Sequence, residues 1–166
     1  MLIFWLVTVE INDTLVVMDS KTLKPPVVAL YLRGSTSSSD EEVQRYNLME
    51  YAKKKDYIIF KEYLDHGYGG DTQASDRKYA PDVIEDARLG KFQVLLVTAV
   101  DRIARDEEYG LNYLRRIEET GCKVNFLDQP YANTPEIYSP DVADMIKNSR
   151  SMLLMGARME LTRIRA

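Results

Sequence analysis

The chain has 166 residues, 45% of them apolar, which is enough for one packed domain. Its net charge is −4 and its pI is near 5.1, whereas a domain that holds DNA by itself is usually basic. The composition therefore argues against an autonomous DNA-binding domain.

Neither disulfides nor a membrane segment is predicted. Cys122 is the only cysteine, which excludes internal disulfides, a multi-thiolate zinc site and a CxxC redox pair. The apolar run over residues 1–7 has no basic flank and is soon interrupted by Glu10 and Asp13, so it is too short to cross a bilayer. We expect a cytoplasmic protein with no membrane partner.

Residues 1–26 are predicted to be an N-terminal appendage of unknown role. They contain a β-prone stretch from Leu2 to Ile11. They end at Pro25 and Pro26, and paired prolines break regular structure and mark a boundary.

Residues 27–138 alternate strands with helices and are predicted to form one domain. Strands are expected over 27–32, 57–64, 92–99 and 122–127, and helices over 40–55, 79–89 and 106–120. This alternation predicts an α/β fold in which a mostly parallel central sheet is flanked by helices on both faces.

Residues 139–166 are predicted to form one long helix. Ser139 is a suitable N-cap, Pro140 suits the first turn, and only Gly156 could break the helix. A helix of about 25 residues is longer than a small domain needs. Its apolar residues include several methionines, which suit surfaces that repack against a partner. The face comprises Val142, Met145, Ile146, Met152, Leu153, Leu154, Met155 and Met159. It either binds a partner helix, which we favour, or closes the domain's own core.

The same C-terminal segment is basic, with five lysines and arginines against Glu160 alone from residue 147 onward. Arg158 and Arg163 could therefore face DNA phosphates. Alternatively, the arginines only complement the dipole at the helix C-terminus.

Three loops that follow predicted strands carry candidate catalytic residues, since sites in open α/β sheets form at the carboxyl ends of strands. The first loop, residues 33–39, contains Arg33 and Ser35 and leads into a helix whose N-terminal amides could hold a phosphate. The second, residues 65–71, is glycine-rich and is followed by Arg77. The third has Arg102 and Arg105 three residues apart, which predicts both on one helical face.

Arginines from all three loops around a serine indicate a phosphate site. Arginine matches phosphate oxygens and remains charged, so it can lower the serine pKa and stabilise a pentacoordinate transition state without a metal. No general base is identifiable. His66, the only histidine, is predicted to be an exposed residue of the glycine-rich loop.

This ordered set resembles the resolvase/invertase family of serine site-specific recombinases from about Val27 to the C-terminus. Residues 31–36 resemble its nucleophile motif, and residues 101–106 are the most specific match. Gln44, Asp76 with Arg77, and Glu160 with Ile164 match further family positions.

The resemblance implies a catalytic domain in which Ser35 attacks the scissile phosphate, forms a 5′-phosphoserine bond and frees a 3′-hydroxyl. Neither ATP nor another cofactor is needed, because the bond energy is conserved. The implied catalytic residues are Ser35, Arg33, Arg102, Arg105, Asp101 and Gln44, with phosphate contacts from Arg77, Arg158 and Arg163.

The implied partners are a double-stranded DNA recombination site and further copies of the chain, as a dimer and then a tetramer. The long helix would be the dimerisation helix, with an interface that includes Met145, Met152, Met155, Met159 and Glu160.

The sequence departs from the family pattern at several positions. The family usually has Ser-Gly where this chain has Gly69 and Gly70, a branched residue at Gly34, and arginine at Leu161. Family members continue into a DNA-binding region after the long helix, so we expect a truncated domain or a shortened relative. Two alternatives remain: another phosphate-processing enzyme on the same sheet, or a non-catalytic assembly module.

Overall fold

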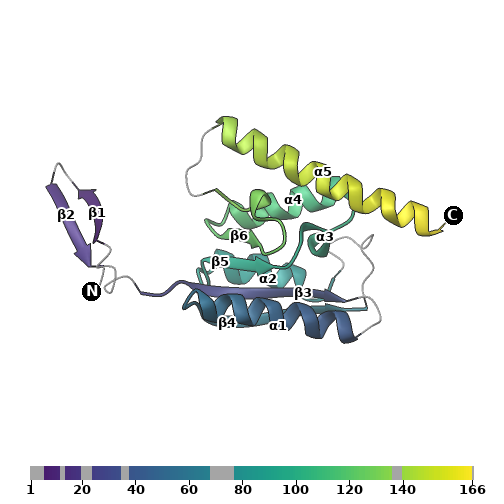
Figure 1. Cartoon of the computed structure of the whole chain (residues 1–166), viewed down its shortest axis with the longest axis horizontal. Coiled ribbons are helices and arrows are strands. Elements are labelled where there is room, and N and C mark those ends of the chain that lie inside the picture. Colours follow the sequence, from purple (N-terminus) through teal and green to yellow (C-terminus); the bar gives the residue numbers. More distant parts are fainter. Residues whose placement is uncertain are drawn as a thin grey trace.

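The computed structural model describes residues 6–11, 14–19, 24–34, 38–67, 77–135 and 140–165. Within the N-terminal appendage, β1 (Leu6–Ile11) and β2 (Thr14–Asp19) pair antiparallel as a separate two-stranded sheet (Figure 1). The sequence predicted the first of these strands and missed the second.

Four parallel strands form the main sheet and confirm the predicted α/β class. They are β3 (Val27–Gly34), β4 (Ile58–His66), β5 (Val94–Val97) and β6 (Lys123–Phe126), in the order β4-β3-β5-β6. Strands β3 and β5 are buried along nearly their whole length, as expected for parallel strands covered on both faces.

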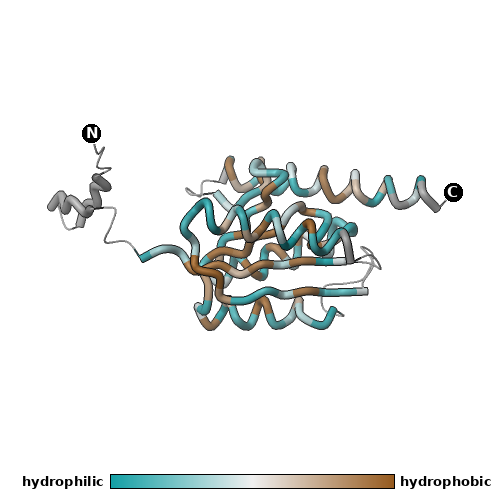
Figure 2. The backbone as a smooth tube through the Cα atoms, turned by 60° about the horizontal axis from the view of Figure 1, so that its bottom comes forward, coloured by the Kyte–Doolittle hydropathy of each residue, from teal (hydrophilic) through white to brown (hydrophobic). Residues whose placement is uncertain are grey.

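Helices cover both faces of this sheet. On one face, α1 (Ser38–Lys54) packs Leu48 and Ala52 against the β3 and β5 side chains of that face. The larger core on the other face is covered by α2 (Ala80–Arg88), the short α3 (Val100–Ile103), α4 (Glu107–Glu118) and α5 (Pro140–Arg165), with a 3₁₀ turn at Pro130–Ala132. Figure 2 shows the apolar strands between these helical layers.

Helix α5 is as long as predicted, at 26 residues. Some of its apolar residues are buried against the domain, and others are exposed. Ile146 and Leu154 are buried against the domain. The four methionines of the predicted interface are 50% to 74% exposed. In Figures 1 and 2 the C-terminal turns of α5 extend beyond the carboxyl ends of the strands. Part of the face therefore closes the core, and part remains uncovered in this chain.

The predicted N-cap of α5, Ser139, lies outside the described residues. Among the described helices, none is both long and apolar enough to cross a membrane.

Candidate functional site

The candidate site lies where β3, β4 and β5 end and where α1 and α3 begin. Arg33, Arg77, Asp101, Arg102 and Gln44 meet there through side-chain and backbone contacts. Ser35 follows the last residue of β3 and lies outside the described residues, as do Asp76, Gly69 and Gly70.

Arg33 is 2% exposed and holds α3 against β3. Its Nε donates to the carbonyl oxygen of Arg102 at 3.0 Å, and its Nη2 donates to that of Asp101 at 2.9 Å. Burial, followed by the positive charge of Arg77, lowers the pKa of Arg33 to about 10. The guanidinium therefore keeps its charge at neutral pH and adds to the positive potential of the site.

Arg77 is also 2% exposed and lies against the same end of α3. Its Nη1 donates to the Tyr31 hydroxyl at 3.1 Å and to the carbonyl oxygen of Ile103. A guanidinium that faces the interior in this way supports a positioning role, and the predicted contact of Arg77 with a DNA phosphate stays a prediction.

The prediction that Arg102 and Arg105 share one helical face is wrong. Helix α3 ends at Ile103, and Ala104 is extended, with φ −159° and ψ 167°. The carbonyl groups of residues 101 to 103 accept from Arg33 and Arg77. These contacts satisfy the helix end from outside, so no further helical turn is needed.

Asp65, at the end of β4, is a site residue that the sequence reasoning did not select. Its side chain is fully buried and accepts from the Tyr31 hydroxyl at 2.9 Å and from the Tyr79 amide at 2.8 Å. Burial raises the pKa of Tyr31 far above its usual value, so the phenol remains a donor. A carboxylate at a strand end before a glycine-rich loop was the available signal. The Asp65–Tyr31–Arg77 chain joins β4 and β3 to the end of α3.

Gln44 on α1 hydrogen-bonds to the main chain of Arg33 in β3, two residues before Ser35. Its Oε1 accepts from the Arg33 amide at 3.3 Å, and its Nε2 donates to the Arg33 carbonyl at 3.0 Å. The same Nε2 donates to Asp40 at 3.1 Å, and Asp40 accepts from Arg102 Nη1 at 2.8 Å. Asp40, a second residue that the sequence reasoning missed, therefore links α1 to α3.

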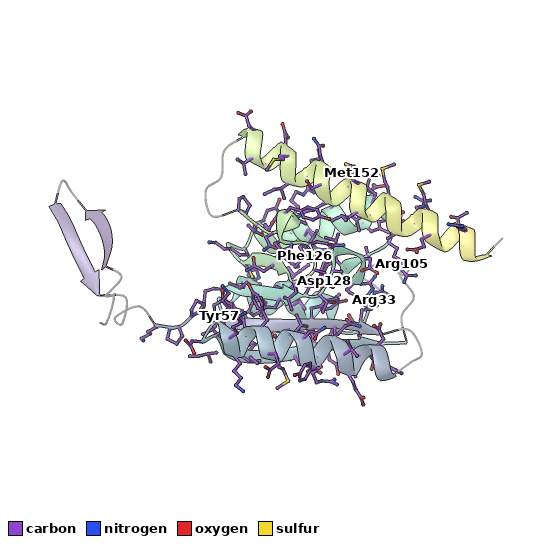
Figure 3. The ribbon with its side chains drawn as sticks, in the orientation of Figure 1. Arg33, Tyr57, Arg105, Phe126, Asp128 and Met152 are labelled. Atoms are coloured by element: carbon purple, nitrogen blue, oxygen red, sulfur yellow. The ribbon has the colours of Figure 1, made fainter. Side chains whose placement is uncertain are left out.

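Arg102 and Arg105 are the more accessible arginines of the group, with side chains 25% and 29% exposed. Asp101 lies 3.9 Å from the Nε of each, so one carboxylate lies within ion-pair distance of both guanidinium groups. Figure 3 shows Arg105 and Arg33 at the same end of the sheet. Two partly open arginines beside a buried third make a site that can bind an oxyanion.

A cleft of about 480 Å³ separates Arg105 from α5. Its lining residues are Asp101, Arg105, Gln129, Met152, Leu153, Gly156, Ala157 and Glu160. The cleft thus brings two predicted interface residues, Met152 and Glu160, next to the arginine site.

Arg158 and Arg163 are exposed on α5, and the described contacts do not join them to the arginine site. Arg158 pairs with Asp106, the N-cap of α4, at 3.3 Å. Among the described residues there is no group of three or more histidine, cysteine, aspartate and glutamate side chains suited to a metal ion.

Comparison with known proteins shows which protein family the chain matches. Residues 28–160 match the family model described as "Resolvase, N terminal domain". Among curated proteins, nothing matches the chain.

Several solved structures share the fold. The N-terminal catalytic domain of TP901-1 integrase is 23% identical, with a TM-score of 0.62, over 82% of this chain and 96% of that one. A resolvase family site-specific recombinase from Streptococcus pneumoniae is 25% identical, with a TM-score of 0.58, over 84% of this chain and 91% of that one. The C-terminal catalytic domain of ISC1926 TnpA, an IS607-like serine recombinase, is 17% identical, with a TM-score of 0.55, over 82% of this chain and 99% of that one.

Proposed function

The chain belongs to the resolvase N-terminal domain family, and from this premise we propose that it cuts and rejoins DNA in site-specific recombination through a covalent phosphoserine at Ser35. The observation that carries the proposal is that Arg33 and Arg77 both donate to carbonyl groups of α3, the helix that carries Arg102. Arg33 lies two residues before Ser35 in the sequence. Asp40 and Asp101 offset part of this positive charge, and a phosphate would offset more of it.

The proposed reaction has two displacements that mirror each other. The Ser35 hydroxyl attacks the scissile phosphate, a 5′-phosphoserine bond forms, and the 3′-hydroxyl of the cut strand leaves. A 3′-hydroxyl from the exchanged strand then attacks the phosphoserine and releases Ser35. Each step makes one phosphate ester and breaks another, so the reaction needs neither ATP nor a metal ion.

The arginines have two proposed tasks. Arg102 and Arg105 contact the phosphate and stabilise the charge of the transition state, with Asp101 orienting both. Arg33, Arg77 and Gln44 position α3 and the end of β3, and the two buried arginines add positive potential from behind.

The proposed substrate is a double-stranded DNA recombination site, which two and then four copies of the chain hold in the cytoplasm. Residues 27–138 carry catalysis, and residues 139–166 carry association together with phosphate contacts from Arg158 and Arg163. The role of residues 1–26 is left open by this assignment.

Covalent capture of DNA tests the proposal. The full product of the gene is incubated with DNA that flanks the gene, with EDTA present, and a denaturing gel is searched for protein joined to DNA. We expect an adduct that disappears in Ser35→Ala and persists in the matched control Ser37→Ala.

Each other outcome contradicts the proposal in a different way. Cleavage that stops with EDTA would indicate a metal-dependent nuclease or phosphatase. DNA binding without any adduct would indicate a non-catalytic assembly module.

A further inference from the structure

Gly34, the last residue of β3, lies in contact with the carboxylate of Glu41. A Cβ atom placed on Gly34 would lie 1.8 Å from Oε1 of Glu41 and 2.4 Å from its Cδ, distances that no side chain can adopt. The glycine therefore makes room for this carboxylate beside the strand end. Glu41 belongs to α1 and is only 6% exposed.

The buried carboxylate of Glu41 holds the imidazole of His66. Nδ1 of His66 lies 2.6 Å from Oε1 of Glu41, the same oxygen that lies over Gly34. A carboxylate accepts hydrogen bonds, so Nδ1 carries the hydrogen and the lone pair of the ring is left on Nε2. The His66 side chain is 59% exposed, as predicted, although His66 is the last residue of β4 and not part of the loop that follows.

Strand pairing places His66 next to the residue that precedes Ser35. His66 is the register partner of Gly34, and the Gly67 amide donates to the Gly34 carbonyl at 2.9 Å. Gly67 has φ 81°, a left-handed conformation that glycine adopts readily, and it turns the chain away immediately after His66. The pairing therefore sets His66 beside the immediate sequence neighbour of Ser35.

We propose that His66 is the general base for Ser35 and that Glu41 positions its ring, in the space that Gly34 provides. This proposal rests on the proposed function, because it names the group that activates the same serine. An imidazole that is oriented by a carboxylate through Nδ1 and accepts a proton at Nε2 is an established way to activate a hydroxyl nucleophile.

The step balances in atoms and charge. The Ser35 hydroxyl proton moves to Nε2 of His66 while the bond between Oγ and phosphorus forms. The bond between phosphorus and the 3′-oxygen breaks, and that oxygen takes a proton from water. The imidazolium then returns its proton to the hydroxide that remains. In the resealing step the imidazole takes the proton of the incoming 3′-hydroxyl, the bond between phosphorus and the serine oxygen breaks, and the imidazolium gives the proton to that oxygen.

Nuclear magnetic resonance tests the positioning without any need for activity, because the chain contains one histidine. At a pH where the ring is neutral, the two ring nitrogens should give the separate ¹⁵N shifts of a fixed Nδ1–H tautomer. Glu41→Gln and Gly34→Val should shift both signals toward the average of the two tautomers. Glu42→Gln, which removes an exposed carboxylate of the same helical turn, should leave them unchanged. Averaged signals in the unsubstituted chain would overturn the proposal.

The rate of adduct formation tests the catalytic role. His66→Asn keeps a donor for Glu41 but lacks the basic nitrogen, and it should slow adduct formation by about a hundredfold or more at neutral pH. Among the described residues, Glu41 is the charged side chain in contact with that ring. Glu41→Gln should slow the reaction by about tenfold.

The failures of the two proposals are distinguishable. If Ser35→Ala abolishes the adduct while His66→Asn keeps the rate of adduct formation, the general-base role is wrong and the recombinase function stands. If the unsubstituted chain forms no adduct, the proposed function fails and the role of His66 fails with it.

Discussion

The buried hydroxyl of Tyr31 connects two charged side chains that would otherwise face each other across the core. It donates to Asp65 and accepts from Arg77, and the Tyr31 side chain is completely buried. A buried polar chain of this kind stabilises the fold only while every member keeps a partner. The hydroxyl therefore affects the arginine site, although it does not touch the proposed substrate.

Tyr31→Phe should lower the free energy of unfolding by about 1–3 kcal/mol, because it leaves buried polar atoms of Asp65 and Arg77 without this partner. Urea denaturation would measure the change. Tyr46→Phe is the matched control, because Tyr46 is 66% exposed, and it should change stability by less than about 0.5 kcal/mol. Equal effects of the two substitutions would show that the hydroxyl chain contributes nothing.

An ion pair between Arg150 and Glu118 attaches α5 to α4. Arg150 is 5% exposed, and its two terminal nitrogens donate to Glu118 on α4 at 2.8 and 3.1 Å. Its Nε donates to the Ala132 carbonyl at 2.8 Å. Further along α5, Leu154 packs against Gly110, where a Cβ would lie 2.8 Å from the leucine methyl. These contacts hold the middle of α5 against α4 and the 3₁₀ turn.

Arg150→Met should lower the free energy of unfolding by about 3 kcal/mol, because Glu118, with a side chain only 13% exposed, would lose the opposite charge and keep only the hydrogen bond from Thr134. The double variant Arg150→Met with Glu118→Leu should recover part of this loss, since it removes both charges. Arg115→Met provides the control, because Arg115 pairs with Glu119 on the exposed face of the same α4 helix and should cost about 0–1 kcal/mol. Thermal and urea unfolding would measure all three, and similar losses for both single variants would contradict the argument.

The sequence predicted the helices and strands better than it predicted the details of the site. Apolar runs and glycine stops located the four strands of the main sheet and helices α1, α2, α4 and α5 to within a few residues. The end of α3 could not be predicted, because side chains from residues 33 and 77 terminate it.

The missed site residues have a related explanation. Asp40 and Glu41 belong to no distinctive motif, and their importance depends on which face of α1 packs inward. Asp65 had a weak signal, its place at a strand end before a glycine-rich loop, but its role depends on the register between β3 and β4. Glu41 is visible as a functional candidate only once Gly34 and His66 are known to be neighbours.

The exposed methionines of α5 lie on a helix whose C-terminal turns extend beyond the carboxyl ends of the strands. Met152 and Met159, seven residues apart, are 74% and 71% exposed. A spacing of seven residues keeps side chains on one stripe of a helix, which suits a partner helix. Met152 also lines the cleft beside Arg105, so a second copy on this stripe would lie next to the arginine site.

Met152→Glu combined with Met159→Glu should therefore weaken self-association of the chain by at least about tenfold, because the charged groups would lose hydration in an apolar interface. Sedimentation equilibrium over a range of concentrations would measure the change. Met49→Glu, at a 48% exposed methionine on α1, carries the same charge on the opposite face of the sheet and should leave association unchanged. An unaltered association constant in the α5 variant would contradict association through this stripe, whereas a loss confined to α5 would connect the proposed assembly to the end of the molecule where the arginines lie.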